Sequence, residues 1–403
     1  MEKQVNIPKL RFPEFSGWWE NNKLGDVGSF FSGGTPLTSK RAYFDGVIPF
    51  IRSGEINSDK TEQFISDEGL KKSSAKMVEK GDLIYALYGA TSGEVGISKI
   101  NGAINQAILC IRTNHNTIYL MNYLRFNKDN IINTYLQGGQ GNLSAEIIKS
   151  LIIPFPSLPE QQKIASFLTA VDDKLQALKK KKSLLEQYKK GIMQKIFSQE
   201  LRFRDDDGND FPEWEEKKFS RYIKLYRGSS PRPINKYITK SDDGVNWIKI
   251  GDMKSVENNL IDQVSEKITT EGALHSRKVE IGELILANSM SFGKTYQLNI
   301  SGCIYDGWFV LREYEKYYDK KFLMQLLNSE YLQKQYKTLS TGGVVQNISS
   351  EIVYSTNLFK PSLTEQSKIA NFLSALDEKI HLAQGQIEKM EVWKKGLLQK
   401  MFV

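Results

Sequence analysis

The sequence predicts an α+β protein made of two similar halves, each with a mixed α/β domain followed by a long helix. Three observations support this prediction. A segment in the middle of the chain recurs at its end, both copies have the apolar spacing of a coiled-coil helix, and short apolar runs separated by turn-forming residues fill the segments before them. We therefore expect two mixed domains separated by two long helices that form an antiparallel coiled coil, with a pseudo-twofold relation between the duplicated halves.

The repeat defines the expected domain boundaries. Residues 156–197 align with residues 361–402 without a gap and are identical at 20 of 42 positions. Weaker similarities also relate the segments before the two copies, such as FPEF at Phe12 and FPEW at Phe211. We place a first domain at residues 1–155, a first helix at 156–203, a second domain at 204–360 and a second helix at 361–403. Since the helices are kept and the domains diverge, the pattern indicates one scaffold with two differently tuned domains, unless the loops simply drifted.

Both copies of the repeat have apolar residues at alternating spacings of three and four, the seam of a coiled-coil helix. Pro159 suits the first turn of the first helix, and Thr364 is a candidate N-cap for the second. About 38 helical residues would form a rod of roughly 57 Å. Because a lone rod would expose its seam, we expect the two helices to pack against each other. The seam residues are Ile164, Leu168, Val171, Leu175, Leu178, Leu185, Ile192 and Ile196, and then Ile369, Leu373, Leu376, Ile380, Ala383, Ile387, Met390, Leu397 and Met401.

Each globular segment has the pattern of short strands joined by turns. Runs such as Val47–Arg52, Asp82–Tyr88 and Ala107–Arg112 are separated by Gly, Asn and Ser clusters. Helical patterns intervene around Ile118–Tyr135 and Lys320–Leu339. Each domain is therefore expected to be an α+β fold.

Composition is that of a folded protein without a membrane span. The 403 residues are enough for two or three domains, and 40% hydrophobic and 25% charged residues match ordinary globular usage. The sequence has no apolar run near the roughly 20 residues that cross a bilayer and no secretion signal, so we expect a cytoplasmic protein. The only cysteines, Cys110 and Cys303, lie in apolar runs, which excludes a disulfide scaffold and a cysteine zinc site.

Motifs for catalysis are missing from the sequence. A methyltransferase needs an Asn/Asp-Pro-Pro-aromatic turn, and this chain has no Pro-Pro dipeptide. The stretch FGKT at Phe292–Thr295 lacks the glycine that a phosphate-binding loop needs five positions before its own glycine, where Asn288 stands. A nuclease pattern could be drawn through Asp210, Glu215 and Lys217, but a solvated loop explains these residues better, since the first half has no counterpart. We expect no catalytic residue, cofactor or metal in this chain.

The net charge of +8 and the pI near 9.0 favour a polyanionic partner. The excess lies mainly in residues 156–203, which hold ten Lys and Arg against five Asp and Glu. The globular segments are nearly balanced, so a nucleic-acid site on them must be a local patch. The run Lys179–Lys182 is more simply a solvated helix face than a DNA contact.

Three pairs of loops have the composition of DNA-contacting segments. A Gly/Ser/Pro turn follows the first strand of each domain, a polar and aromatic tip follows the strand that starts at Gly81 or Gly282, and a glycine-rich loop precedes Ser144 or Ser349. Hydroxyls, free N–H groups and arginines suit phosphates, whereas Asn, Gln and Lys can hydrogen-bond base edges. The alternative is that these are ordinary turns. The candidate DNA-binding residues are Ser32, Gly33, Gly34, Thr35, Arg41, Arg52, Tyr85, Tyr88, Thr91, Ser92, Asn105, Gln106, Gln140 and Asn142 in the first domain, and Arg227, Ser229, Ser230, Arg232, Lys249, Asn288, Ser289, Ser291, Phe292, Lys294, Tyr305, Gln346 and Asn347 in the second.

Equivalent strand positions of the two domains carry different side chains. Asn105 and Gln106 in the first domain correspond to Tyr305 and Asp306 in the second. Such a change is what a difference in base preference between the two domains would produce.

The layout resembles the specificity subunit of type I restriction-modification systems. The motifs that carry the resemblance are LRFPEF near the start, the twice-repeated P-S-L-x-E-Q-x-K-I-A-x-F-L-x-A-x-D-x-K and the K-K-G-x-x-Q-K-x-F ending of each copy. The resemblance spans the whole chain, but the recognition domains match no consensus from which base contacts could be carried over.

The resemblance implies two target-recognition domains in opposite orientation, each reading one half of a split DNA sequence. The two helices would act as spacer and as docking surface for methyltransferase subunits. The implied partners are double-stranded DNA, two adenine methyltransferase (modification) subunits and two restriction (ATPase and nuclease) subunits. S-adenosylmethionine, ATP and Mg would belong to those partners, and this chain would be non-catalytic. Two alternatives remain open: a coiled-coil scaffold for protein or RNA partners, and a specificity module that serves methylation alone.

Overall fold

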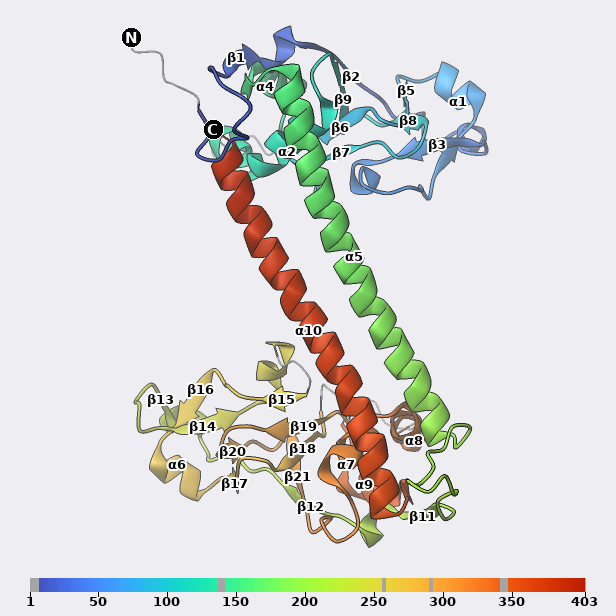
Figure 1. Cartoon of the computed structure of the whole chain (residues 1–403), viewed down its shortest axis with the longest axis vertical. Coiled ribbons are helices and arrows are strands. Elements are labelled where there is room, and N and C mark those ends of the chain that lie inside the picture. Colours follow the sequence, from blue (N-terminus) through green and yellow to red (C-terminus); the bar gives the residue numbers. More distant parts are fainter. Residues whose placement is uncertain (1–6, 137–141, 256–258, 290–292, 341–346, 403) are drawn as a thin grey trace. The chain divides into compact units, whose positions relative to one another are not determined.

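The computed structural model describes residues 7–136, 142–255, 259–289, 293–340 and 347–402. The chain divides into two compact units, Met1–Ala177 with Ile387–Val403, and Leu178–Gln386 (Figure 1). Two long helices, α5 (Leu158–Phe197) and α10 (Leu363–Met401), each contribute residues to both units. Within the described residues, no helix combines the length and the apolar character that crossing a membrane requires.

The globular part of the first unit contains two four-stranded sheets and a two-stranded ribbon. One sheet has the order β2-β9-β6-β7, the other β4-β3-β8-β5, and β1 pairs with β10. The strands are β1 (Glu20–Lys23), β2 (Gly28–Ser32), β3 (Ile48–Ile51), β4 (Phe64–Ile65), β5 (Lys76–Val78), β6 (Leu83–Ala86), β7 (Val95–Ile97), β8 (Gly102–Ile104), β9 (Ile108–Thr113) and β10 (Ile152–Phe155), and the short helices are α1 (Asp67–Lys71), α2 (Thr117–Phe126), α3 (Lys128–Leu136) and α4 (Ala145–Ser150).

The second unit repeats this topology with one further edge strand in each sheet, β15 in one and β13 in the other, which confirms the internal duplication and the α+β prediction. Its sheets have the orders β12-β21-β18-β19-β15 and β13-β16-β14-β20-β17, and β11 pairs with β22. The parallel pair β14–β20 corresponds to the parallel pair β3–β8. The strands are β11 (Glu215–Lys218), β12 (Lys224–Arg227), β13 (Ile238–Thr239), β14 (Val245–Ile248), β15 (Leu260–Ile261), β16 (Glu266–Ile268), β17 (Arg277–Val279), β18 (Leu284–Ala287), β19 (Thr295–Leu298), β20 (Gly302–Ile304), β21 (Trp308–Arg312) and β22 (Asn357–Lys360), and the short helices are α6 (Thr270–Leu274), α7 (Lys320–Leu327), α8 (Glu330–Leu339) and α9 (Ser350–Ser355).

Each helical pattern expected inside the domains is divided into two helices. In the first domain α2 ends before Asn127, whose side-chain amide donates to the Tyr123 carbonyl and so closes the last turn. In the second domain α7 ends before Asn328, and the Ser329 hydroxyl caps α8 by accepting from the Leu332 N–H. Asn and Ser compete for backbone hydrogen bonds in this way, which is why they interrupt an otherwise periodic pattern.

Each domain is packed against the start of one long helix and the end of the other. In the first unit, Leu168 of α5 and Phe402 just beyond α10 share a core with the face of the β2-β9-β6-β7 sheet that carries Leu83 and Leu109. In the second unit, Phe197 at the end of α5 and Leu373 of α10 share the equivalent core. Phe197 and Phe402 are the same position of the repeat, so the recurring final phenylalanine is a core anchor for the domain that its helix reaches last.

The two long helices contact each other in antiparallel fashion in both units. Lys394 of α10 donates to Asp172 of α5 in the first unit, and Lys189 of α5 donates to Asp377 of α10 at 2.6 Å in the second. Asp172 and Asp377 are equivalent positions of the 205-residue repeat, and so are Lys189 and Lys394. The two ion pairs are therefore equivalent. Every predicted seam residue is buried or half-buried, in agreement with the coiled-coil prediction.

The Glu-Gln pair of the repeated motif ties each helix start to its domain. Glu160 is 1% exposed and accepts two hydrogen bonds from the Arg11 guanidinium and one from the Trp19 indole N–H. Gln161 beside it accepts from the Asn116 backbone N–H and donates to the Pro156 carbonyl, which fixes the start of α2.

The second copy has the same contacts. Glu365 is 0% exposed and accepts from Arg202 and from the Trp214 indole N–H, and Gln366 accepts from the Asp319 backbone N–H. These contacts explain why the motif keeps a charged residue and an amide on an otherwise apolar turn.

One predicted cap was wrong. Helix α10 begins at Leu363, so Thr364 lies inside its first turn, and the Ser362 hydroxyl accepts the hydrogen bond from the Glu365 N–H instead. An N-cap side chain reaches the N–H two or three residues further along, and Ser362 has this offset relative to Glu365.

Candidate nucleic-acid interface

In the first domain, several predicted residues meet at the turn between β8 and β9, where the chain passes from one sheet to the other. The Gly34 N–H donates to the Ile104 carbonyl at 3.2 Å, and the Thr35 hydroxyl donates to the Gln106 side-chain oxygen at 2.6 Å. Asn105 stabilises the turn itself, because its side-chain oxygen accepts from the Ala107 N–H. Gln106 is exposed. The glycine turn after β2 and the β8–β9 turn thus form one surface.

In the second domain, four predicted residues converge on Asp306, in the turn between β20 and β21. The Asp306 carboxylate oxygen Oδ2 accepts from the Ser230 hydroxyl and from the Arg232 guanidinium, both at 3.2 Å. The Asp306 backbone carbonyl accepts from Arg227 Nε at 3.3 Å and from Asn288 Nδ2 at 2.8 Å. The sequence comparison pairs Asp306 with Gln106 but does not count it among the candidate DNA-binding residues, and the structure places it at their centre.

The two surfaces have the same backbone frame. Ser229 donates its backbone N–H to the Ile304 carbonyl, as Gly34 does to Ile104 in the first domain. A Cβ added at Gly33 would lie 1.8 Å from the Ile104 carbonyl oxygen, and one added at Gly228 would lie 2.0 Å from that of Tyr305. Only glycine allows these backbone segments to approach so closely.

A cleft of about 380 Å³ is lined in part by Arg227 and Asn288, two of the residues that contact Asp306. Arg227, Asn288 and Asn347 contribute to its wall, so the cleft brings one residue from each of the three predicted loops of this domain together.

The tips after β6 and β18 differ from expectation. Tyr85 is 0% exposed in the core between the sheet and the helices, so it offers no side-chain surface to DNA. Burial raises the pKa of its phenol well above the usual range. Tyr88 is half-buried, and Asn288 is 6% exposed and acts by holding the Asp306 backbone.

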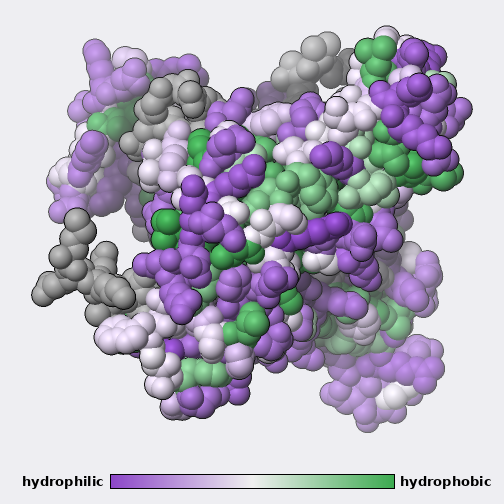
Figure 2. Space-filling view, turned by 90° about the horizontal axis from the view of Figure 1, so that it is seen from above, coloured by the Kyte–Doolittle hydropathy of each residue, from purple (hydrophilic) through white to green (hydrophobic). Residues whose placement is uncertain are grey.

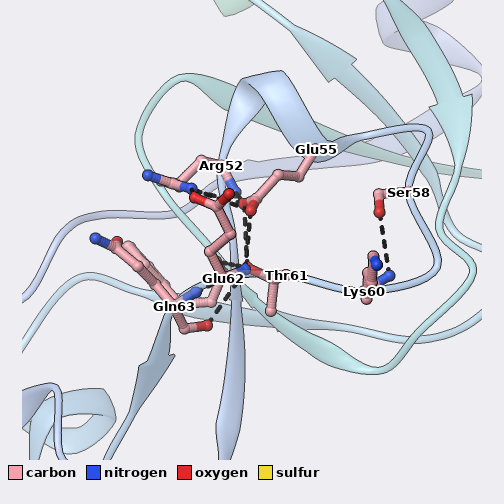
Figure 3. Close-up of polar contacts among 8 residues, drawn as sticks. Arg52, Glu55, Ser58, Lys60, Thr61, Glu62 and Gln63 are labelled. Atoms are coloured by element: carbon pink, nitrogen blue, oxygen red, sulfur yellow. Dashed lines mark hydrogen bonds and ion pairs between the residues drawn. The ribbon is translucent and has the colours of Figure 1, made fainter. Parts of the chain in front are cut away.

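The charge of several predicted cations is compensated locally. Figure 3 shows the Arg52 guanidinium lying against Glu55 and Glu62. Its Nη2 atom is 3.1 Å from Glu55 Oε1 and 2.8 Å from Glu62 Oε2. Burial opposes ionisation of Glu55, but hydrogen bonds from Arg52, from the backbone N–H groups of Glu62 and Arg52, and from the Thr61 hydroxyl lower its pKa to about 2. Lys249 pairs with Glu266 in the same way. These two cations act as parts of local ion pairs.

The remaining predicted residues are placed as follows. Arg41, Asn142 and Asn347 are exposed, and Lys294 is exposed beside the Tyr296 ring. Ser32, Thr91, Ser92, Ser289 and Tyr305 are half-buried, and the Ser92 hydroxyl donates to the Leu87 carbonyl. Gln140, Ser291, Phe292 and Gln346 lie outside the described residues.

The described residues include no cluster of three or more His, Cys, Asp or Glu that could hold a metal ion. Asp210 pairs with Arg204, and Glu215 pairs with Lys217 and Lys360. Hydrophilic residues cover most of the face shown in Figure 2, with smaller hydrophobic areas between them. The arrangement is therefore one of exposed hydrogen-bonding groups and cations on rigid turns, which suits binding of a polar, anionic ligand.

Comparisons with known proteins agree with this organisation. The family model described as type I restriction modification DNA specificity domain matches the chain twice, at residues 17–187 and 213–392. The type I restriction enzyme MjaVIII specificity subunit of Methanocaldococcus jannaschii is 22% identical over 96% of this chain and 92% of its own length.

Two solved structures share the fold. One is the S subunit of a type I restriction-modification system from M. genitalium, with a TM-score of 0.59, 16% identity and coverage of 98% of this chain and 99% of that one. The other is a chain from a study of assembly and conformational transition of a type I restriction-modification system, with a TM-score of 0.61, 16% identity and coverage of 95% and 97%.

Proposed function

Because the chain belongs to the family of type I restriction-modification DNA specificity domains, we propose that it is the subunit that selects the DNA target of a type I restriction-modification complex. The observation that carries the proposal is that the family model matches each half separately. Each half also forms a complete domain in which an equivalent turn, β8–β9 or β20–β21, joins the two sheets; we call it the crossing turn. Each domain reads one half of a two-part DNA sequence with the surface around Gln106 or Asp306.

The helices set the gap between the two half-sites and dock the methyltransferase subunits. Both α5 and α10 contribute residues to both units, so we expect helix length to set the gap between the half-sites. Half-sites about one DNA turn apart, roughly 34 Å, suit two domains related by a pseudo-twofold axis.

This chain contributes binding and no catalysis. Two adenine methyltransferase subunits supply S-adenosylmethionine and the methylating site, and two restriction subunits supply ATP- and Mg-dependent cleavage. The assembled complex is then an adenine-specific DNA methyltransferase and an ATP-dependent endonuclease in the cytoplasm.

Exposed cations beside the β20–β21 turn of the second domain and after the glycine turn of the first domain favour DNA reading over a protein scaffold. Arg227 and Arg232 adjoin Asp306, and Arg41 follows the glycine turn of the first domain. A protein that neutralises several phosphates loses affinity steeply as salt rises, because counterions are released on binding. The test measures the affinity of the full chain for DNA between 50 and 200 mM salt. An affinity that does not change over this range would favour the scaffold.

Lengthening both helices is expected to widen the recognised gap. Four residues inserted after Lys180 in α5 and four after Gly385 in α10 add about 6 Å to each helix, which corresponds to one or two base pairs. Four residues are close to one helical turn, so the seam keeps its face within about 40°. We expect the methylated sequence to gain one or two base pairs in its gap and to keep both half-sites.

The matched control is the same insertion in the exposed hairpin between Asp205 and Asp210, which should leave the gap unchanged. A chain with both lengthened helices that still methylates DNA at the original gap would contradict the spacer role of the helices.

A further inference from the structure

The turn that joins the two sheets carries a different hydrogen-bonding group in each domain, in the same structural position. Gln106 follows Asn105 in the first domain, and Asp306 follows Tyr305 in the second. Both turns are closed by the same backbone hydrogen bond. The Ile108 N–H donates to the Asn105 carbonyl, and the Trp308 N–H donates to the Tyr305 carbonyl. The two side chains therefore leave equivalent backbones.

The position is rigid because strands hold it from both sides. In the first domain the Leu87 N–H donates to the Ala107 carbonyl at 2.8 Å, and in the second the Asn288 N–H donates to the Gly307 carbonyl at 2.9 Å. Strands β8 and β20 before the turn, and β9 and β21 after it, are buried over most of their length. A side chain on such a turn is well placed for base recognition, which needs a fixed donor or acceptor.

We infer that Asp306 and Gln106 set the base preference at equivalent positions of the two half-sites. Asp306 accepts a hydrogen bond from the exocyclic amino group of a cytosine, and Gln106 pairs with an adenine. This inference rests on the proposed DNA-reading function and adds to it the residues that distinguish the two domains.

The surroundings of Asp306 leave one carboxylate oxygen for a ligand. Among the described residues, both hydrogen bonds to its carboxylate, from Ser230 and Arg232, fall on Oδ2. Its side chain is 37% exposed, so the carboxylate lies partly in solvent. A carboxylate can only accept, and the major-groove edge of cytosine offers only the N4 donor, whereas adenine sets an acceptor beside its donor.

An acidic group on a DNA-facing surface needs a compensating charge, and Arg232 supplies it. The Arg232 side chain is 82% exposed, so this ion pair adds little to the stability of the fold. The arginine also keeps the carboxylate from repelling the phosphates next to the base that it contacts.

Gln106 presents a neutral amide where Asp306 presents a carboxylate. Its amide carries both a donor and an acceptor, the pattern that matches N6 and N7 of adenine. The Thr35 hydroxyl donates to its oxygen, so the amide is oriented by the glycine turn beside it. The Gln106 amide is itself uncharged, in keeping with a purely hydrogen-bonding contact.

The test exchanges acid and amide at each position in the full chain assembled with its methyltransferase subunits. Asp306→Asn keeps the size of the side chain and the backbone carbonyl that Arg227 and Asn288 contact. Gln106→Glu makes the reverse change in the first domain. Asp262→Asn, in the exposed loop between β15 and β16, removes the same charge from the second domain and serves as the control.

The readout is the relative rate of methylation of the wild-type target and of duplexes altered at one base pair at a time. Asp306→Asn should lower the preference for cytosine at one position of one half-site about tenfold or more, and Gln106→Glu should do so for adenine in the other half-site. The half-site of the unaltered domain and the Asp262→Asn profile should not change.

Unchanged base preferences in both variants would overturn the inference while leaving the DNA-reading function intact. A variant that no longer methylates is measured instead by competition binding with the same duplexes, and an equal loss for all of them would also overturn it. A wild-type assembly without a preferred sequence would refute the proposed function itself, so the two failures are distinguishable.

Discussion

Replacing Glu365 by Gln is expected to lower the free energy of unfolding of the second unit by about 3–5 kcal/mol, the usual cost of breaking a buried ion pair from one side. Glu365 is 0% exposed, and its carboxylate accepts from the Arg202 guanidinium and from the Trp214 indole N–H. The amide that replaces it has one acceptor for these donors. The cationic Arg202, only 20% exposed, loses its buried charge partner and keeps only the exposed Glu213.

Glu213 provides the control, because it pairs with the same arginine at 3.2 Å but is 91% exposed. Glu213→Gln should change the free energy of unfolding by no more than about 0.5 kcal/mol. The measurement is denaturant unfolding of the full chain, followed by hydrogen exchange in peptides from residues 178–386. Equal, small effects of the two substitutions would show that the repeated Glu-Gln motif does not anchor the helix to its domain.

Replacing Gly228 by Ala is expected to reduce methylation of the target by roughly 100-fold, because displacing a contact surface by about 1 Å can cost that much. The added Cβ would lie 2.0 Å from the Tyr305 carbonyl oxygen, so the turn after β12 must move away from the β20–β21 turn. This movement separates Ser230 and Arg232 from Asp306 and so disrupts the surface that they form.

Gly251→Ala is the matched control, since a Cβ there would meet no atom within 4 Å. It should methylate at the wild-type rate. Hydrogen exchange of β12 and β21 establishes that the Gly228→Ala chain is folded before its rate is compared. A folded Gly228→Ala chain with wild-type methylation would show that the close approach of the two turns is not needed for DNA reading.

The long helices and the duplication could be predicted from sequence because their signals are local and periodic. Alternating spacings of three and four report the seam directly, and an ungapped repeat reports the internal symmetry. Residues such as Glu160 and Phe402 belong to that repeat, but their roles depend on partners from distant segments, which spacing does not reveal. The same limit explains the cap at Ser362, which only the observed start of α10 identifies.

The candidate surface was harder to predict because its residues come together from distant loops. Asp306 gathers residues from the turn after β12 and from the end of β18, and no motif links these segments in sequence. Loop composition predicts Tyr85 as part of a polar tip, but Tyr85 lies in β6, a strand that is buried on both faces and therefore has no polar side in its sequence pattern. Loop composition thus predicted segments that the structure brings into contact, but it did not separate the residues that face solvent from those that support them.

The most direct test of the account is to map methylated adenines. The chain is co-expressed with its adenine methyltransferase subunit in a host without adenine methylation, and modified adenines are located across the genome. We expect every modified adenine to fall in one two-part sequence with a gap of fixed length, because two domains on helices of fixed length read it. Co-purifying subunits that leave the genome unmodified, or that modify adenines without a shared two-part sequence, would contradict the account.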